Sequence, residues 1–170
     1  MEIVPENKVV RKVAEQEHRF TLGHYPLACV DLVVVGHTPE PSFLLIQRTE
    51  PPCKDIFWLP GGRIFKNEGL ETAAMRKLQE ELGIHARPNL VRQLGAFDFS
   101  SREARYDDIP QGFHAIGICY ALSFQERPTI TLDDTARDYM WVTGKTLDET
   151  NGTLHPYIRE VITASNIFKR

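Results

Sequence analysis

The sequence predicts an α/β (α+β) fold in which helices cover a mixed β-sheet. Three observations carry this prediction. Apolar runs rich in β-branched residues have the length of buried strands, as in residues 28–36 and 113–124. Between these runs, apolar side chains recur every four residues from Leu70 to Leu82, which indicates a helix with one buried stripe. Residues 156–168 show a second helical pattern near the end of the chain.

The composition indicates one soluble domain over residues 1–170, because a chain of 170 residues can bury an ample core. Hydrophobic residues make up 42% and charged residues 25%, which is ordinary for a globular protein. A net charge of −3 gives no general attraction to nucleic acid or to anionic lipid, so we expect neither as a partner. An anionic substrate would therefore be bound by a few placed cations.

The cysteines and the N-terminus favour a cytoplasmic location. Cys29, Cys53 and Cys119 are odd in number and show neither CxxC nor zinc-site spacing, so we expect them to be reduced and buried. The start of the chain carries charges where a signal peptide has an apolar core. No apolar run approaches the ~20 residues of a membrane span, and we expect no membrane association.

The first half of the chain predicts a short helix and a hairpin. Sparse apolar positions suggest the helix at residues 8–20. Three consecutive valines within residues 28–36 suit a strand that is covered on both faces. A turn at residues 37–41 then leads into a second strand at residues 42–48, antiparallel to the first.

Charged residues mark the ends and the interior of these strands. Asp31 interrupts the valine-rich strand, where a carboxylate is costly unless it is paired or hydrogen-bonded. It is therefore either a site residue or a salt-bridged structural acid. Arg48 and Arg63 flank a short strand at residues 56–59, and two guanidinium groups there suit a clamp for a diphosphate. Taken singly, each arginine is as well explained as a surface residue.

The second half predicts three further strands and the C-terminal helix. The strands are expected at residues 90–99, 113–124 and 139–142, and we expect the helix at 156–168 to serve packing. Residues 100–112 form a polar loop long enough to act as a binding lid. His114 follows this loop at the mouth of the central strand, as either a structural or a substrate-facing histidine.

The central helix carries an unusual cluster of charges beside its buried stripe. At 3.6 residues per turn, Lys77, Glu80 and Glu81 project from one arc, and Arg76 stands one turn before Glu80. Adjacent carboxylates repel each other, so a helix usually exposes both to solvent or to a cation. Gly83 ends the helix.

This spacing resembles the Nudix box, G-x5-E-x7-R-E-U-x-E-E-x-G-U, where U is apolar. The eight matching positions are Gly62, Glu68, Arg76, Leu78, Glu80, Glu81, Gly83 and Ile84. The chain departs from the pattern at Lys77, where the family usually has the first glutamate of its R-E-U-x-E-E run. The plainer reading is a surface amphipathic helix that follows a tight turn. The resemblance implies an α/β/α sandwich in a single Nudix domain.

A wider resemblance covers most of the chain and points to GDP-mannose mannosyl hydrolases. It rests on the order and spacing of the segments 25–31, 47–49, 57–63, 106–108, 138–141 and 154–155, together with His114. It implies a Mg²⁺-dependent hydrolase of a GDP-mannose-like nucleotide-sugar, in which water attacks the anomeric carbon. The products would be a nucleoside diphosphate and free sugar. A homodimer formed through the N-terminal segment is implied as well.

The resemblance also implies a metal site on the box. The carbonyl of Gly61 and the carboxylate of Glu81 would bind Mg²⁺, with Glu80 as a further ligand, since oxygen donors suit this hard cation. Glu81 would thereby be catalytic. Glu68 would pair with Arg76 and fix the loop against the helix.

Four positions are implied to meet the substrate. Arg48 and Arg63 would be catalytic as well as substrate-binding, because they would neutralise the charge that develops on the departing diphosphate. Asp31 and His114 would contact the substrate. This logic holds whether the bond that breaks is C–O or P–O.

The sequence does not identify the general base, because the mannosyl hydrolases have Gln-His where this chain has Thr135 and Ala136. Alanine cannot accept a proton from the attacking water. The substitutes that the sequence offers are Asp133, Asp134, His114 and Asp107.

Three functions therefore remain from the sequence. The first is hydrolysis of a nucleotide-sugar at the sugar carbon, and the second is a Nudix diphosphohydrolase that cuts within the diphosphate. The third is a nucleotide-sugar binding module that has lost catalysis through Lys77 and Ala136. Identification of both products separates the three.

Overall fold

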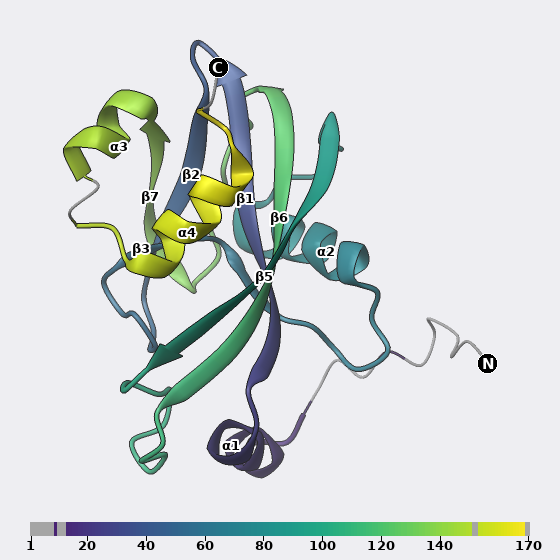
Figure 1. The fold of residues 1–170 in the computed structure, drawn as a ribbon. Coiled ribbons are helices and arrows are strands. Elements are labelled where there is room, and N and C mark those ends of the chain that lie inside the picture. The colour runs from purple at the N-terminus through teal and green to yellow at the C-terminus, as the bar shows by residue number, and fades with distance from the viewer. Residues whose placement is uncertain (1–8, 10–12, 151–152, 169–170) are drawn as a thin grey trace.

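The computed structural model describes residue 9 and residues 13–150 and 153–168, which form a seven-stranded sheet with flanking helices (Figure 1). The strands are β1 (Leu27–Thr38), β2 (Ser42–Arg48), β3 (Phe57–Trp58), β4 (Gly61–Arg63), β5 (Leu90–Ser101), β6 (Phe113–Glu126) and β7 (Ala136–Thr143). The helices are α1 (Glu15–His24), α2 (Leu70–Leu82), α3 (Gly144–Thr150) and α4 (Pro156–Ser165).

The sheet is mixed, as predicted, and strand β1 is its central member. Strand β1 runs parallel to β6 from Leu27 to Thr38, whereas the pairings of β1 with β2, of β2 with β7 and of β5 with β6 are antiparallel. Along its other edge, β1 pairs first with β4 at residues 29–31 and then with β2 at residues 35–36. The two partners thus pair with different stretches of β1, and the glycine-rich segment β4 lies beside Asp31.

Helices cover both faces of the sheet, which confirms the predicted sandwich of helix, sheet and helix (Figure 1). Alternate residues of β1 point to opposite faces, as the pleat of a strand requires. Val30, Leu32 and Val34 pack into the core on the α2 side, whereas Val33 and Val35 pack on the α4 side. The run of valines therefore reflects burial on both faces, as the sequence predicted.

Helix α2 follows the predicted pattern closely. It begins at Leu70 and ends at Leu82, and its C-cap is Gly83, whose φ of 63° lies in the left-handed region that favours glycine. Leu78 and Leu82 are fully buried against the sheet. The same helix buries Glu81, which is only 5% exposed and is the acidic residue that faces the candidate site.

Several predicted boundaries differ from the structure. Of the helix predicted at residues 8–20, positions 8 and 10–12 lie outside the described residues, and α1 itself begins at Glu15 and continues to His24. Strand β3 is only two residues long. Helix α3 and strand β4 were not predicted, because α3 contains few apolar residues and β4 is formed by Gly61, Gly62 and Arg63.

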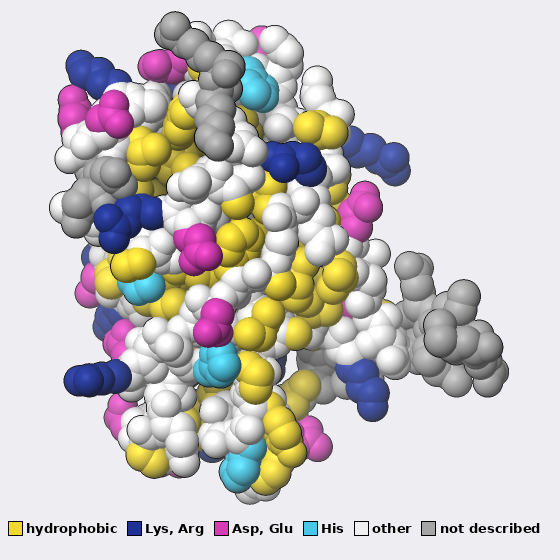
Figure 2. All heavy atoms as spheres, in the orientation of Figure 1, with side chains coloured by type: hydrophobic (Ala, Val, Ile, Leu, Met, Phe, Trp, Pro, Cys, Tyr) yellow, Lys and Arg dark blue, Asp and Glu magenta, His cyan; other side chains and the backbone are white. Residues whose placement is uncertain are grey.

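The longest helix in the described part of the chain, α2, has 13 residues. No helix there combines the length and the apolar character that crossing a bilayer needs. On the face that carries α4, hydrophobic side chains lie in separate patches between charged ones (Figure 2). The three cysteines are buried and free, as expected.

Candidate active site

A cavity of about 220 Å³ lies beside the paired strands β1 and β4, and it brings together residues that are far apart in the sequence. Its walls come from strands β1 to β6, from helices α1, α2 and α4, and from the loops that follow β2 and β5 and precede β7. Four cationic side chains line it, namely Arg48, Arg63, Lys77 and Arg105, together with three acidic ones, Asp31, Glu50 and Glu81. In a chain of net charge −3, this excess of cations marks a local site for an anion.

Asp31 lies in this cavity beside a tyrosine from the C-terminal helix. The O–H of Tyr157 donates a short hydrogen bond to the Oδ2 atom of Asp31. Two glycines leave room for the pair, since a Cβ atom on Gly117 would lie 2.0 Å from the tyrosine oxygen, and one on Gly61 would lie 2.6 Å from Oδ1 of Asp31. The strands thus approach the Asp31 carboxylate as closely as glycine allows.

The environment of Asp31 raises its pKa, so the protonated form is more populated in the folded protein than it would be in water. Burial is the main cause that raises the pKa of Asp31, the hydrogen bond from Tyr157 and the charge of Arg48 oppose the rise, and Glu81 adds to it, so that the pKa lies at about 6. Burial and the neighbouring Asp31 raise the pKa of Tyr157, so the tyrosine remains a donor. No described lysine or arginine forms an ion pair with Asp31, which speaks against the salt-bridged structural role.

The cationic wall of the cavity is formed by side chains from separate loops and strands. Arg48 is held by a hydrogen bond of 2.9 Å from its Nε atom to the carbonyl of Pro52. Arg105 comes from the loop between β5 and β6 and forms an ion pair of 3.3 Å with Glu50. Burial lowers the pKa of His18, and the positive charges of Arg63 and Arg105 lower it further. The electrostatic effect of both arginines therefore reaches the part of the cavity that His18 lines.

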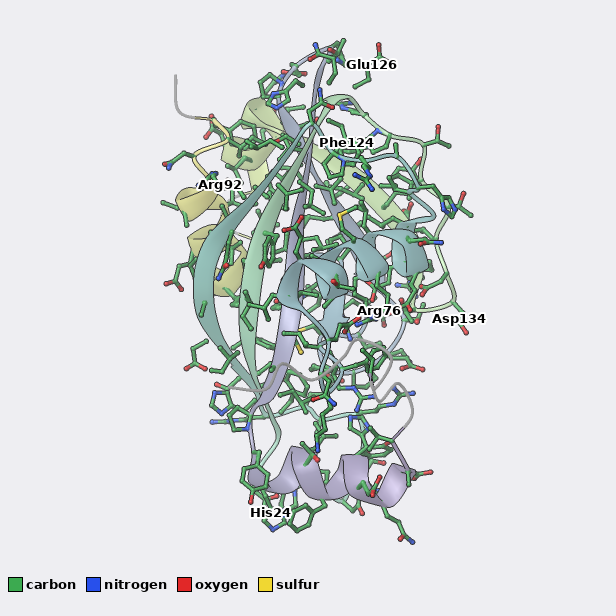
Figure 3. All side chains as sticks on the ribbon, turned by 90° about the vertical axis from the view of Figure 1, so that its right-hand side faces the viewer. His24, Arg76, Arg92, Phe124, Glu126 and Asp134 are labelled. Atoms are coloured by element: carbon green, nitrogen blue, oxygen red, sulfur yellow. The ribbon has the colours of Figure 1, made fainter. Side chains whose placement is uncertain are left out.

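Arg76 anchors the end of β4, where Arg63 lies, and the loop that follows it. Its Nε and Nη2 atoms bind the two oxygens of Glu68 at 2.6 and 2.8 Å, and Nη2 also donates to the carbonyl of Arg63 at 2.9 Å. Figure 3 shows Arg76 on the side of α2 that faces α1. The side chains of Glu68 and Arg76 are only 3% and 10% exposed. The predicted pairing of these two residues is therefore confirmed.

Lys77 contacts the two carboxylates that follow it on the helix. Its Nζ atom lies 3.0 Å from Oε1 of Glu81 and 3.5 Å from Oε2 of Glu80. The other oxygen of Glu81 accepts a hydrogen bond of 2.9 Å from the N–H of Gly61. Burial raises the pKa of Glu81, while Lys77 and the Gly61 N–H partly offset that rise. Both oxygens of Glu81 are thus engaged by the protein itself.

The residues expected to bind Mg²⁺ do not fit a preformed metal site. Mg²⁺ requires about six oxygen ligands in octahedral geometry, close to 2.0–2.1 Å away. Within the described part of the chain, no three His, Cys, Asp or Glu side chains are grouped to hold a metal. The ammonium of Lys77 contacts Glu81 and Glu80 instead, and Glu80 also binds Arg76 at 2.8 Å. A metal ion would have to displace these protein cations.

Of the predicted site residues, the structure brings Asp31, Arg48, Gly61, Arg63 and Glu81 to one cavity. Glu80 is not among the residues that line it, and its side chain is 45% exposed. His114 is not brought to the cavity, because its neighbours Phe113 and Ala115 on β6 face the cavity and its own side chain points to the opposite face. Its ring instead contacts Asp98 on β5 at 2.6 Å.

The four side chains offered as substitutes for the missing base do not line the cavity. Asp133 accepts hydrogen bonds from the N–H and the hydroxyl of Thr135, so it orders the turn before β7. Asp134 is exposed and projects outward from that turn (Figure 3). Asp107 is exposed in the loop after β5.

Reasoning from the sequence missed several contributors to the cavity, among them Tyr157, Gly117 and Arg105. Tyr157 was assigned to packing alone, yet it also donates to Asp31. A glycine inside an apolar central strand often marks a close approach, and Gly117 could have been identified on that ground. Arg105 gave no signal beyond its place in the long polar loop.

Comparison with known proteins gives one family and two informative relatives. The NUDIX domain model matches residues 27–163. The low-salt glycan biosynthesis protein Agl8 of Haloferax volcanii is 28% identical over 160 residues, which cover 93% of this chain and 94% of that protein. The ADP-ribose pyrophosphatase of Methanocaldococcus jannaschii is 30% identical over 115 residues, which cover 68% of this chain and 60% of that protein.

Solved structures share the fold. The NUDIX domain of Shewanella oneidensis NrtR, crystallised with ADP ribose, has a TM-score of 0.65 and 23% identity, and the match covers 91% of this chain and 97% of that domain. The MutT protein from Methanosarcina mazei Go1 also has a TM-score of 0.65 and 23% identity, with 86% and 99% of the two chains covered.

Proposed function

The chain belongs to the NUDIX domain family, and on this premise we propose that it hydrolyses a nucleotide-sugar, releasing a nucleoside diphosphate and free sugar. The observation that carries the proposal is the cavity lined by Arg48, Arg63, Lys77 and Arg105. Four cations are suited to the charge that collects on a departing diphosphate. GDP-mannose is the first substrate to test, as the wider resemblance suggested.

The cavity also offers an uncharged wall. Trp58 stacks on Tyr157 with ring centroids 5.4 Å apart, and Phe99 packs against Trp58 at 4.7 Å. These three rings and Phe113 line the same cavity as the cations. A ligand with a charged diphosphate and a less polar sugar or base matches such a cavity, because the cations can bind the diphosphate while the aromatic rings pack against the less polar end.

We assign the general base to Asp31. Its Oδ2 atom accepts from Tyr157, whereas no described residue donates a hydrogen bond to Oδ1, which leaves that atom available for water. A pKa of about 6 suits a base that works near neutral pH. In the proposed step the water oxygen forms a bond to the anomeric carbon, and one water proton passes to Asp31. The C–O bond to the diphosphate breaks, and its electron pair stays on the diphosphate.

Nudix hydrolases generally use a divalent metal, and Mg²⁺ is our prediction for this chain. Because Lys77 and Arg76 already engage Glu81 and Glu80, protein ligands alone do not make a site for it. We therefore propose that the Arg48 and Arg63 side chains neutralise the charge of the diphosphate. The homodimer predicted through the N-terminal segment remains a prediction, since most of that segment lies outside the described residues.

The same assay also tests a second function, hydrolysis within the diphosphate. The relative named ADP-ribose pyrophosphatase favours cleavage within the diphosphate, which would release a nucleoside monophosphate and a sugar phosphate. The length-wide match to a protein of glycan biosynthesis favours nucleotide-sugars as substrates without choosing the bond.

The proposal is tested by incubating the protein with a panel of nucleotide-sugars, with and without Mg²⁺, and identifying both products by chromatography. Nucleoside diphosphate together with free sugar supports the proposed reaction. Nucleoside monophosphate with sugar phosphate supports the second function, and binding without turnover of any compound supports a binding module that has lost catalysis.

Replacing Arg63 should slow the reaction without unfolding the protein. We expect Arg63→Ala to lower kcat by roughly 10²-fold, or about 2.7 kcal/mol, because the guanidinium meets charge that develops in the transition state. Arg63→Lys should recover part of the rate, since it restores the charge but not the two-point geometry. Thermal unfolding should hardly change, because Arg63 contributes its carbonyl rather than its side chain to the contact with Arg76. Wild-type kcat in Arg63→Ala would remove this residue from the mechanism.

A further inference from the structure

We propose that the Lys77 ammonium takes the place of a metal ion at Glu81 and binds the substrate's diphosphate directly, so that the protein binds a diphosphate without any divalent metal. This inference rests on the proposed function and assigns a role to one residue of the same cavity. It begins from the disagreement between the expected metal ligands and their observed contacts.

The first step is the position of the ammonium. Lys77 lines the cavity together with Gly61, Gly62 and Glu81. Its chain crosses directly over Gly62, where a Cβ atom would lie 2.8 Å from the Cε atom of the lysine. Because glycine at this position leaves that space open, the lysine can reach the cavity from α2. The φ of 155° at Gly62 is one that other residues rarely adopt.

The second step is the number of donors on the ammonium. A lysine carries three N–H groups. Contacts at 3.0 Å to Glu81 and 3.5 Å to Glu80 use two directions. The third direction remains for a ligand in the cavity that Lys77 lines, and an anion is the ligand that a cation there attracts.

The third step is the charge balance. The Glu81 side chain is 7% exposed, so its carboxylate needs a compensating charge close by. Lys77 supplies this charge as a permanent part of the chain, where a metal site would need an ion from solution. With Arg48, Arg63 and Arg105 on the other walls, the cavity holds four cations against three acidic side chains before any ion binds.

The test is calorimetric binding of inorganic pyrophosphate in the presence of EDTA, which needs neither a known base nor a known sugar. The wild-type protein should bind pyrophosphate in EDTA, and Lys77→Met should weaken that binding by about tenfold to a hundredfold, the loss expected for a charge-assisted hydrogen bond. Lys77→Arg should retain most of the affinity. The matched control Lys145→Met, at an exposed lysine on α3, should bind as the wild type does.

Folding is controlled with a second variant. If Lys77→Met leaves Glu81 too poorly compensated to fold, the double variant Lys77→Met with Glu81→Gln keeps the acceptor for Gly61 and removes the unpaired charge. It should fold and show the same loss of pyrophosphate binding in EDTA.

Lys77→Glu completes the test, because it restores the carboxylate that the Nudix box usually has at this position. It should lose pyrophosphate binding in EDTA and should bind Mg²⁺ more tightly than the wild type in the absence of any phosphate. The proposal is overturned if wild-type protein binds pyrophosphate only with Mg²⁺, or if folded Lys77→Met binds it in EDTA as well as the wild type. Either result would leave the proposed hydrolysis standing, since hydrolysis is read from products and not from this binding.

Discussion

Asp31→Asn should lower kcat by about 10³-fold and at the same time make the folded protein more stable at pH 8. The first effect follows from the loss of a proton acceptor, since general bases contribute roughly 10²- to 10⁴-fold. Asparagine has nearly the same shape and can still accept the hydrogen bond of Tyr157. The fold around the residue should therefore persist.

The stability change follows from the direction of the pKa shift. The pKa of Asp31 is raised from 3.8 to about 6 in the folded protein, so between these values the folded state binds the proton more tightly than the unfolded chain. The stability of the wild type should then fall as the pH rises from about 4 through 6. Asparagine carries no such proton, and Asp31→Asn should gain about 3 kcal/mol relative to wild type at pH 8.

Thermal unfolding at pH 5 and pH 8, combined with steady-state kinetics, checks both effects. Asp107→Asn is the matched control, an exposed aspartate that the sequence offered as an alternative base, and it should leave kcat and stability unchanged. If Asp31→Asn destabilises the protein at pH 8, Asp31 is a structural acid. If it keeps wild-type kcat, another group is the base.

Arg76→Met should cost about 3–5 kcal/mol of unfolding free energy, the largest stability effect that we expect from one substitution. The change leaves the buried carboxylate of Glu68 without its two-point partner, and removing one member of a buried ion pair has a cost of this size. It also removes the stacking of the guanidinium on Phe65, 4.1 Å from the ring centroid, and the hydrogen bond to the carbonyl of Arg63. The midpoint of thermal unfolding should fall by roughly 10 °C.

Two comparisons isolate this effect. Arg87→Met removes an exposed arginine just beyond α2 and should leave the unfolding midpoint within about 1–2 °C of wild type. Arg76→Met combined with Glu68→Gln should recover part of the loss, because no buried charge is then left unpaired. A midpoint in Arg76→Met close to that of Arg87→Met would mean that the ion pair does not hold the loop.

The elements with a strong apolar pattern were predicted well from the sequence. Helix α2 and the strands β1, β2 and β6 follow a repeat of apolar side chains, and burial imposes that repeat. Strand β4 could not be found in this way, since Gly61, Gly62 and Arg63 have no apolar alternation and pair with β1 only because the sheet brings them there. Helix α1 was displaced by several residues because its apolar positions are sparse.

Only part of the candidate site could be predicted from the sequence. The spacing on α2 placed Lys77 within reach of Glu80 and Glu81, because contacts between residues three and four apart depend on helix geometry alone. The contact between Asp31 and Tyr157 joins residues 126 positions apart, and no local pattern encodes it. The same limit applies to His114, whose face of β6 is decided by the register of the sheet.

The central claim is that water attacks the sugar carbon and that the diphosphate leaves intact. Hydrolysis of the best nucleotide-sugar in water enriched with ¹⁸O, followed by ³¹P NMR of the products, tests this most directly. We predict that the nucleoside diphosphate carries no ¹⁸O at either phosphorus, because the new oxygen bond forms at carbon. An isotope shift on the phosphorus of a nucleoside monophosphate or of a sugar phosphate would show attack at phosphorus and would contradict the account.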